Sequence, residues 1–137
     1  MVVLDASFVI GWAYRESPAS LDDQIRRVTE DLAYVPAHWT LEITNTLLNS
    51  ARRGRLDVRQ RGEILAAIRL LPIKADTETW VRGWDDIMAL AHQHSLTTYD
   101  AAYLELAMRL GATLATRDGQ LRAAAATAAG VPLVAVR

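Results

Sequence analysis

The sequence contains no cysteine and only one lysine among its fifteen basic residues. Without cysteine the chain cannot form a disulfide scaffold, a thiolate zinc site, an iron–sulfur cluster or a cysteine nucleophile. No apolar run is long enough to cross a membrane, and the apolar start of the chain lacks a basic leader and contains Asp5. We therefore expect a cytoplasmic protein with no membrane span and no signal peptide.

The motifs of several common α/β enzymes are also missing. No Gly-x-Gly-x-x-Gly follows the first apolar run, and there is neither a Walker phosphate loop nor a Gly-x-Ser-x-Gly elbow. His92 and His94 are two positions apart on a predicted helix and point in different directions, so we expect surface residues and no metal pair. We expect His38 to be a packing or surface residue. These absences leave the carboxylates as the candidates for chemistry.

The length and composition fit one globular domain covering residues 1–137. Of the 137 residues, 51% are hydrophobic and 23% charged, and the net charge of −1 does not by itself indicate a nucleic-acid partner. Five arginines nevertheless fall within residues 52–61. They are either a phosphate-contacting patch or a solvated connection between two helices.

Hydrophobic periodicity predicts strands separated by helices, which favours parallel pairing and an α/β sandwich. The segment 34–35 is too short to assign. Ser7, Asp57, Thr97 and Asp118 are candidate helix caps, and Gly54, Gly111 and Gly130 are candidate helix ends. Strands are predicted at residues 2–4, 73–75, 112–116 and 132–136, and helices at 7–14, 21–32, 36–53, 57–71, from 76 or 77 through 91, 97–110 and 118–129.

A row of apolar residues at helical spacing runs from Trp80 to Ala91. Trp80, Trp84, Ile87, Met88 and Ala91 would share one face of a single helix. We predict that this face belongs to the core, the alternative being part of an oligomer surface.

Three acids stand at the ends of predicted elements. Asp5 follows the first strand, Asp100 lies in the first turn of a helix, and Asp118 lies just past a strand. Strand carboxyl ends and helix amino ends gather at one edge of a parallel sheet, so the three acids could meet there. Helix capping explains Asp100 and Asp118 equally well. It does not explain Asp5, because an ionised carboxylate after a buried strand needs a partner.

Glu42 is a fourth candidate. With Asn45 and Asn49 it forms a polar stripe on the helix predicted at residues 36–53, and a solvated stripe would look the same. Asparagine is a poor helix former, so we expect Asn45 to have a polar partner. Oxygen ligands without cysteine or suitable histidine select Mg²⁺ or Mn²⁺, and such a site suits activation of water for attack on phosphorus.

Four segments carrying these acids resemble the PIN-domain ribonucleases, specifically the VapC-like toxins of type II toxin–antitoxin pairs. The matching segments occur in order over nearly the whole chain: VVLDAS at residues 2–7, LEITN at 41–45 with RRGRL at 52–56, TYDAAYLELA at 98–107, and LATRD at 114–118.

The resemblance implies a three-layer α/β/α sandwich with a mostly parallel sheet of four or five strands. It places the family's acidic quartet on Asp5, Glu42, Asp100 and Asp118, with Asp5 and Asp100 holding Mg²⁺. Gly119 and Gln120 depart from relatives that have a further charged residue there, which puts a second metal ion in doubt. Ser7, Asn45 and Thr116 match the polar positions that orient the acids or water.

The implied activity is metal-dependent cleavage of RNA, restrained by a cognate antitoxin, in a protein that forms homodimers. Two other functions stay open. A non-catalytic PIN-like binding module would keep the fold but lose the acids. A metal-dependent phosphatase or phosphoacceptor domain is the enzyme alternative, although no second Asp stands two residues after Asp5 and Lys74 precedes a predicted helix start.

Overall fold

The computed structural model describes residues 1–15, 25–26, 28–30, 32–128 and 130–135. Its sheet has four strands, all parallel, in the order β3-β2-β1-β4. The strands are β1 (Val2–Leu4), β2 (Ala33–Val35), β3 (Ile73–Ala75) and β4 (Thr113–Ala115). The helices are α1 (Ala6–Arg15), α3 (Trp39–Arg52), α4 (Val58–Arg69), α5 (Thr79–Arg82), α6 (Asp86–His94), α7 (Thr98–Leu110) and α8 (Gly119–Thr127).

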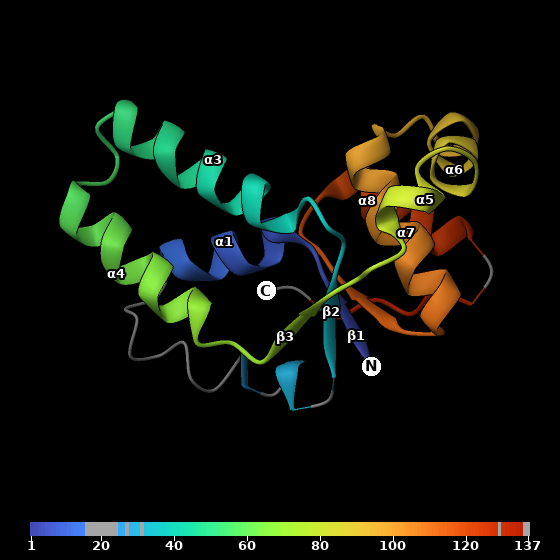
Figure 1. Cartoon of the computed structure of the whole chain (residues 1–137), viewed down its shortest axis with the longest axis horizontal. Helices are drawn as coiled ribbons and strands as arrows, with labels where there is room; N and C mark the ends of the chain where they lie inside the picture. Colours follow the sequence, from blue (N-terminus) through green and yellow to red (C-terminus); the bar gives the residue numbers. More distant parts are fainter. Residues whose placement is uncertain (16–24, 27, 31, 129, 136–137) are drawn as a thin grey trace.

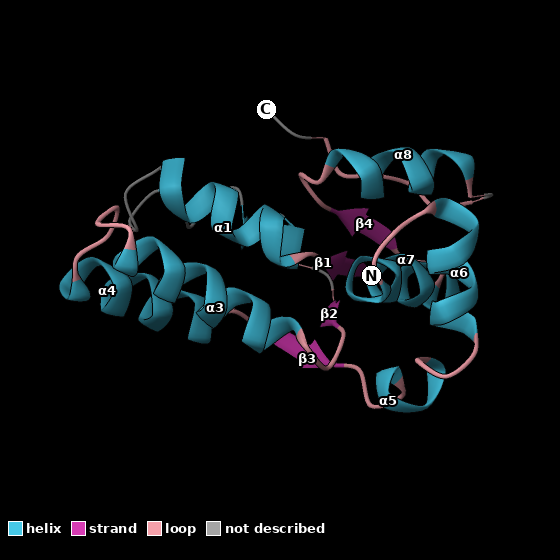
Figure 2. Cartoon of the chain, turned by 90° about the horizontal axis from the view of Figure 1, so that it is seen from above, coloured by secondary structure: helices cyan, strands magenta, loops and turns pink. Residues whose placement is uncertain are grey.

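The sheet lies between two groups of helices. Seen from above, α1, α3 and α4 lie on one side of the strands, and α6, α7 and α8 lie on the other (Figure 2). This confirms the predicted α/β/α architecture with a parallel sheet. Of the strand predicted at residues 132–136, the described residues 132–135 form a single parallel bridge, between Leu133 and Leu114.

The core is built around β1, the central strand. Val3 and Leu4 are fully buried between β2 and β4, as short apolar strands of a parallel sheet should be. Every residue from 101 to 107 of α7 is buried as well, because the sheet covers one side of this helix and Ile87 and Ala91 of α6 cover another. The start of α7 is therefore held rigidly beside the end of β1.

Local capping signals set several helix boundaries as predicted. Asp57 and Gln60 form a reciprocal capping box at the start of α4. Gly111 ends α7 with a φ of 60°, a left-handed conformation that glycine adopts at little cost. The prediction for Ser7 is wrong, because α1 already begins at Ala6 and the Ser7 hydroxyl binds Asp5 instead.

The tryptophan face is not part of the core. The predicted helix is broken between α5 and α6, and Trp80, Trp84 and Met88 are 76%, 70% and 57% exposed. The two indole rings contact each other edge to face, with centroids 6.5 Å apart. Only Ile87 and Ala91 pack inward. The break changes the direction of the chain at residues 83–85, so the apolar residues before and after it no longer share a face.

Two further predictions concern the rest of the chain. Half of the helix predicted at residues 21–32 lies outside the described residues, and of the other half residues 25–26 and 28–29 are helical. The arginines of residues 52–61 surround the turn between α3 and α4, at the end of this helix pair away from the sheet (Figure 1). Arg52, Arg53, Arg55 and Arg59 are exposed there. No helix in the described part of the chain is long and apolar enough to span a membrane.

Candidate active site

Asp5 lies at the carboxyl end of β1 and is almost completely buried, with 3% of its surface exposed. Two hydroxyl groups donate to the same carboxylate oxygen, Oδ2: Ser7 Oγ at 2.5 Å and Thr116 Oγ1 at 2.6 Å. Among the described residues, no basic side chain forms an ion pair with Asp5. A buried carboxylate held only by neutral donors is costly to ionise.

The electrostatics of Asp5 reflect this setting. The pKa of Asp5 is raised to about 6. Burial is the main cause, and the negative charges of Glu42 and Asp100 act in the same direction, whereas the hydroxyls of Ser7 and Thr116 lower the pKa. A cation bound at this edge of the sheet would favour the ionised form instead. Asp5 therefore has the properties of a ligand for a positive charge.

The two hydroxyls also connect Asp5 to the chain that follows β4. The Ser7 hydroxyl accepts a hydrogen bond from the backbone N–H of Arg117, and the Thr116 hydroxyl accepts one from the N–H of Asp118, both at 3.0 Å. Each hydroxyl has one hydrogen, which points to Asp5. The positions predicted to orient the acids, Ser7 and Thr116, thus contact Asp5 directly.

Glu42, on α3, is held on the other side of the site. The buried hydroxyl of Tyr103 donates to Glu42 Oε1 at 2.5 Å, and His38 Nε2 lies 3.0 Å from the same oxygen. His38 Nε2 also lies 3.1 Å from the carbonyl oxygen of Tyr99. Because a carboxylate and a carbonyl both accept hydrogen bonds, Nε2 must carry a hydrogen. Burial, Asp5 and Glu42 raise the pKa of Tyr103 well above its ordinary value, so this phenol stays a donor.

Asp100 and Asp118 occupy the starts of α7 and α8. Thr97 caps α7 by accepting from the Asp100 N–H at 3.1 Å. Burial raises the pKa of Asp100, and the charges of Asp118 and Glu42 raise it further. Asp118 is itself a cap, with Oδ1 accepting from the Leu121 N–H at 2.7 Å. Asp118 therefore both caps α8 and lies close enough to Asp100 to affect its charge.

The structure therefore brings the four predicted acids within electrostatic range of one another. In the described ranges, however, no three acidic or histidine side chains converge closely enough to hold a metal ion between them. Tyr103 and His38 hold Glu42 to one side, and the cap holds one oxygen of Asp118. The donor set, all oxygen around a buried acid of raised pKa, fits Mg²⁺ or Mn²⁺.

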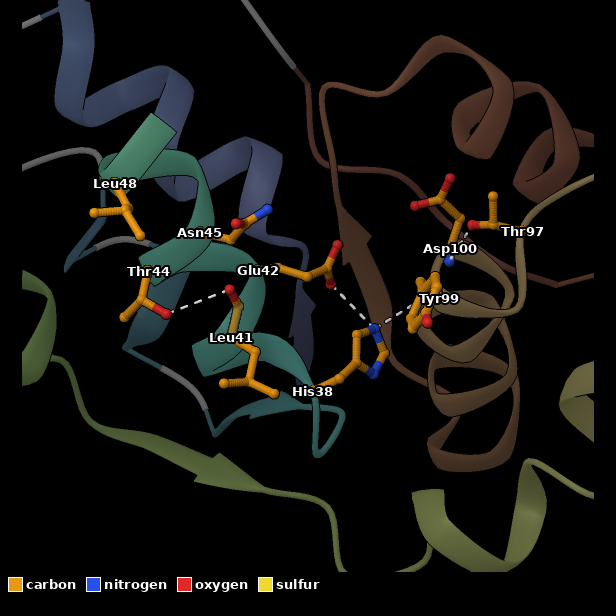
Figure 3. Close-up of a pocket in the computed structure, with 9 residues that line it drawn as sticks. All are labelled: His38, Leu41, Glu42, Thr44, Asn45, Leu48, Thr97, Tyr99 and Asp100. Carbon is orange, nitrogen blue, oxygen red and sulfur yellow. Dashed lines mark hydrogen bonds and ion pairs between the residues drawn. The ribbon is translucent and has the colours of Figure 1, made fainter. Parts of the chain in front are cut away.

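Asn45 is exposed, and no described group forms a hydrogen bond with it, so the expected polar partner is not found among the described residues. It lies instead on the wall of a cavity of about 670 Å³ between α3 and the start of α7, which Glu42 and Asp100 also line (Figure 3).

Two residues that hold Glu42, His38 and Tyr103, were not predicted as part of the site. The edges of the Tyr99 and Tyr103 rings pack against His38, with centroids 5.6 and 5.4 Å away, which confirms a packing role. The contact between His38 and Glu42 was not predicted, nor was the hydroxyl of Tyr103 on Glu42. The spacing of four positions between His38 and Glu42 on one helix face was the available indication.

Comparisons with known proteins agree with this fold. The PIN domain model matches residues 2–127. Ribonuclease VapC3 from Pyrobaculum aerophilum is 35% identical over 80 residues, which are 58% of this chain and only 61% of that relative's length. The crystal structure of PAE2754 from the same organism superposes with a TM-score of 0.68 at 26% identity, covering 97% of this chain and 90% of that one. The chain belongs to the PIN domain family.

Proposed function

We propose that the protein is a metal-dependent endoribonuclease. One observation carries the proposal: acids from four separate elements surround the carboxyl end of β1, where Asp5 is buried with neutral donors. Family membership and the similarity to Ribonuclease VapC3 support RNA as the substrate.

In this proposal Asp5 and Asp100 hold Mg²⁺, and Glu42 and Asp118 complete the acidic site. The ion supplies activation of water and neutralisation of the charge that develops on the phosphate. Ser7 and Thr116 keep Oδ2 of Asp5 occupied with hydrogen bonds, so Oδ1 is the oxygen that would hold a metal ion. Tyr103 and His38 fix the position of Glu42.

The test is cleavage of end-labelled RNA by the purified chain with Mg²⁺ and with EDTA. Asp100→Asn keeps the hydrogen bond from the backbone N–H of residue 100 to the Thr97 hydroxyl but removes the negative charge. We therefore expect a folded protein whose activity is lowered by about 10- to 100-fold or more. Full activity of Asp100→Asn would leave Asp100 as a helix-start residue only.

The chemistry predicts the products. Attack by water does not use the ribose 2′-hydroxyl, so the ends should be 5′-phosphate and 3′-hydroxyl, and a 2′-deoxy nucleotide at the cut should be tolerated. Cyclic phosphates formed in EDTA would refute the mechanism. Hydrolysis of a phosphomonoester without RNA cleavage would favour a phosphatase. Absence of metal binding in calorimetry would favour a non-catalytic binding module.

We further propose that the protein is a cytoplasmic toxin of a type II toxin–antitoxin module and acts as a homodimer. The acidic site would be inhibited by a basic residue, such as an arginine from the antitoxin, that pairs with the carboxylates in place of the metal. The antitoxin would place an amphipathic helix on an apolar groove of the toxin.

Co-expression with the product of the neighbouring small open reading frame tests this second step. We expect a stable complex with suppressed ribonuclease activity, restored when the inhibiting arginine is replaced. A neighbour that does not bind, or that binds without suppressing cleavage, would refute the toxin–antitoxin assignment and leave the nuclease assignment standing.

A further inference from the structure

The cavity beside the acids has features that the four carboxylates do not explain. It is continuous with the acidic site, because Glu42 and Asp100 line both (Figure 3). Leu41 and Leu48 of α3 form an apolar wall, and Tyr99 stands opposite at the start of α7. Its volume of about 670 Å³ lies within the range of about 300–1,000 Å³ for small-ligand sites.

The exposure of the lining is unusual for apolar groups. Leu41 is 71% exposed and Tyr99 is 63% exposed, although both adjoin a half-buried carboxylate. Asn45 adds an amide, which can both donate and accept hydrogen bonds, whereas the Thr44 hydroxyl already donates to the carbonyl oxygen of Thr40 at 2.9 Å. An aromatic ring, aliphatic side chains and one amide together suit a flat heterocycle with polar edges.

The charge of the cavity selects against an anionic occupant. Its charged lining consists of Glu42 and Asp100, and His38 contacts Glu42. A phosphate group inside the cavity would meet two carboxylates, whereas an uncharged base would not. The phosphate would be placed at the acids only with the metal ion, and the base attached to it would lie to one side.

His38 links the two sides of the cavity, α3 and the start of α7. Its Nε2 contacts the carbonyl oxygen of Tyr99 on α7 and the carboxylate of Glu42 on α3, and its ring packs against the edge of Tyr99. The position of Tyr99 is thus set before any ligand binds, which lowers the cost of ordering it.

From these observations we propose that the cavity is a nucleobase subsite: an unpaired base of the RNA strand stacks on Tyr99 while its edge meets Asn45. The proposal rests on the proposed function and adds that the RNA must be single-stranded where it is cut. Stacking on an aromatic ring accepts every base, and the Asn45 amide supplies the preference among bases.

The binding test uses fluorescein-labelled single-stranded RNA ten-mers of A, U or C and a matched abasic ten-mer, with the full chain in Ca²⁺, a divalent ion that oxygen ligands also hold. Tyr99→Ala should weaken binding of the base-containing RNAs by about 5- to 100-fold, the effect of one stacked base. Tyr99→Phe keeps the ring and should stay within about 2-fold of wild type. Asn45→Ala should reduce the differences among the three sequences.

Trp80→Ala is the matched control, because Trp80 is as exposed as Tyr99 but lies on α5, outside the cavity. It should leave RNA binding unchanged. The abasic RNA should bind wild type and Tyr99→Ala equally, since it has no base to stack.

Three results would overturn the subsite. These are equal RNA binding by wild type and Tyr99→Ala, an equal loss on the abasic RNA, or equal cleavage of a fully paired duplex and a single strand. The first, with RNA cleavage intact, leaves the nuclease function standing and assigns the cavity to another occupant, such as an apolar side chain of a protein partner. A chain that binds RNA through Tyr99 but does not cleave it keeps the subsite and refutes the proposed function.

Discussion

Replacing Asp5 by asparagine should make the protein more stable and inactive at the same time. Asparagine has the same shape, and its side-chain oxygen can still accept from Ser7 and Thr116. It cannot carry the negative charge that burial disfavours. The structure therefore predicts that the carboxylate is retained at a cost in free energy of unfolding.

The size of this cost follows from the pKa of Asp5, which is raised from 3.8 to about 6 in the folded protein. The folded state therefore holds a proton that the unfolded state loses first, and the free energy of unfolding falls as the pH rises between these two values. A separation of about two pH units corresponds to about 3 kcal/mol, fully expressed above about pH 7.

The assay is urea denaturation of wild type and Asp5→Asn in EDTA at intervals from about pH 4 to about pH 8. The difference in free energy of unfolding should move in favour of the variant by about 3 kcal/mol across this range. The raised pKa of Asp100 has burial, Asp118 and Glu42 as its main causes, so its contribution largely cancels in the difference. Adding Mg²⁺ at about pH 8 should stabilise the wild type alone.

A difference that stays constant with pH would refute the reasoning, because it would mean that Asp5 titrates alike in the folded and unfolded chains. A difference that moves in favour of the wild type would show that its hydrogen bonds outweigh burial. Stabilisation of both proteins by Mg²⁺ would remove Asp5 from the metal site.

Other variants test other parts of the molecule. Arg109 pairs with Asp76 at 2.7 Å and with Glu105 at 2.8 Å, and both carboxylates are nearly buried. Arg109→Met would leave them without a partner, so it should lower the free energy of unfolding by about 3–5 kcal/mol in urea titrations. A loss below about 1 kcal/mol would contradict this. Trp80→Ser should change it by less than about 0.5 kcal/mol, and a larger loss would restore the predicted core role. Replacing Arg52 and Arg53 by glutamine removes two positive charges, so it should weaken RNA binding at all sequences alike and lower the slope of its salt dependence by about 1.4. An unchanged slope would make these arginines a solvated helix connection.

Features encoded by neighbouring residues were predicted well. An apolar triplet followed by Asp5 indicated both the central strand and the acid at its end. The caps at Asp57, Thr97 and Asp118 followed from residue type and spacing alone. In each case the physical cause lies within a few positions of the residue concerned.

Features that depend on distant segments were not predictable in this way. Hydrophobic periodicity assumes a continuous helix, so it placed Trp80 and Trp84 in the core when the chain in fact changes direction after Arg82. His38 and Glu42 interact with α7 residues about sixty positions later in the chain. Local patterns cannot show which residues such a distance brings together.

The order of the strands has a consequence for how the protein is made. β1 is the first strand to be synthesised, but one of its two neighbours, β4, is nearly the last. Thr116, which binds Asp5, emerges from the ribosome 111 residues after it. A nascent chain therefore has no complete acidic site until β4 pairs with β1. A chain that stops before residue 113 lacks β4, Thr116 and Asp118, and it cannot form this site.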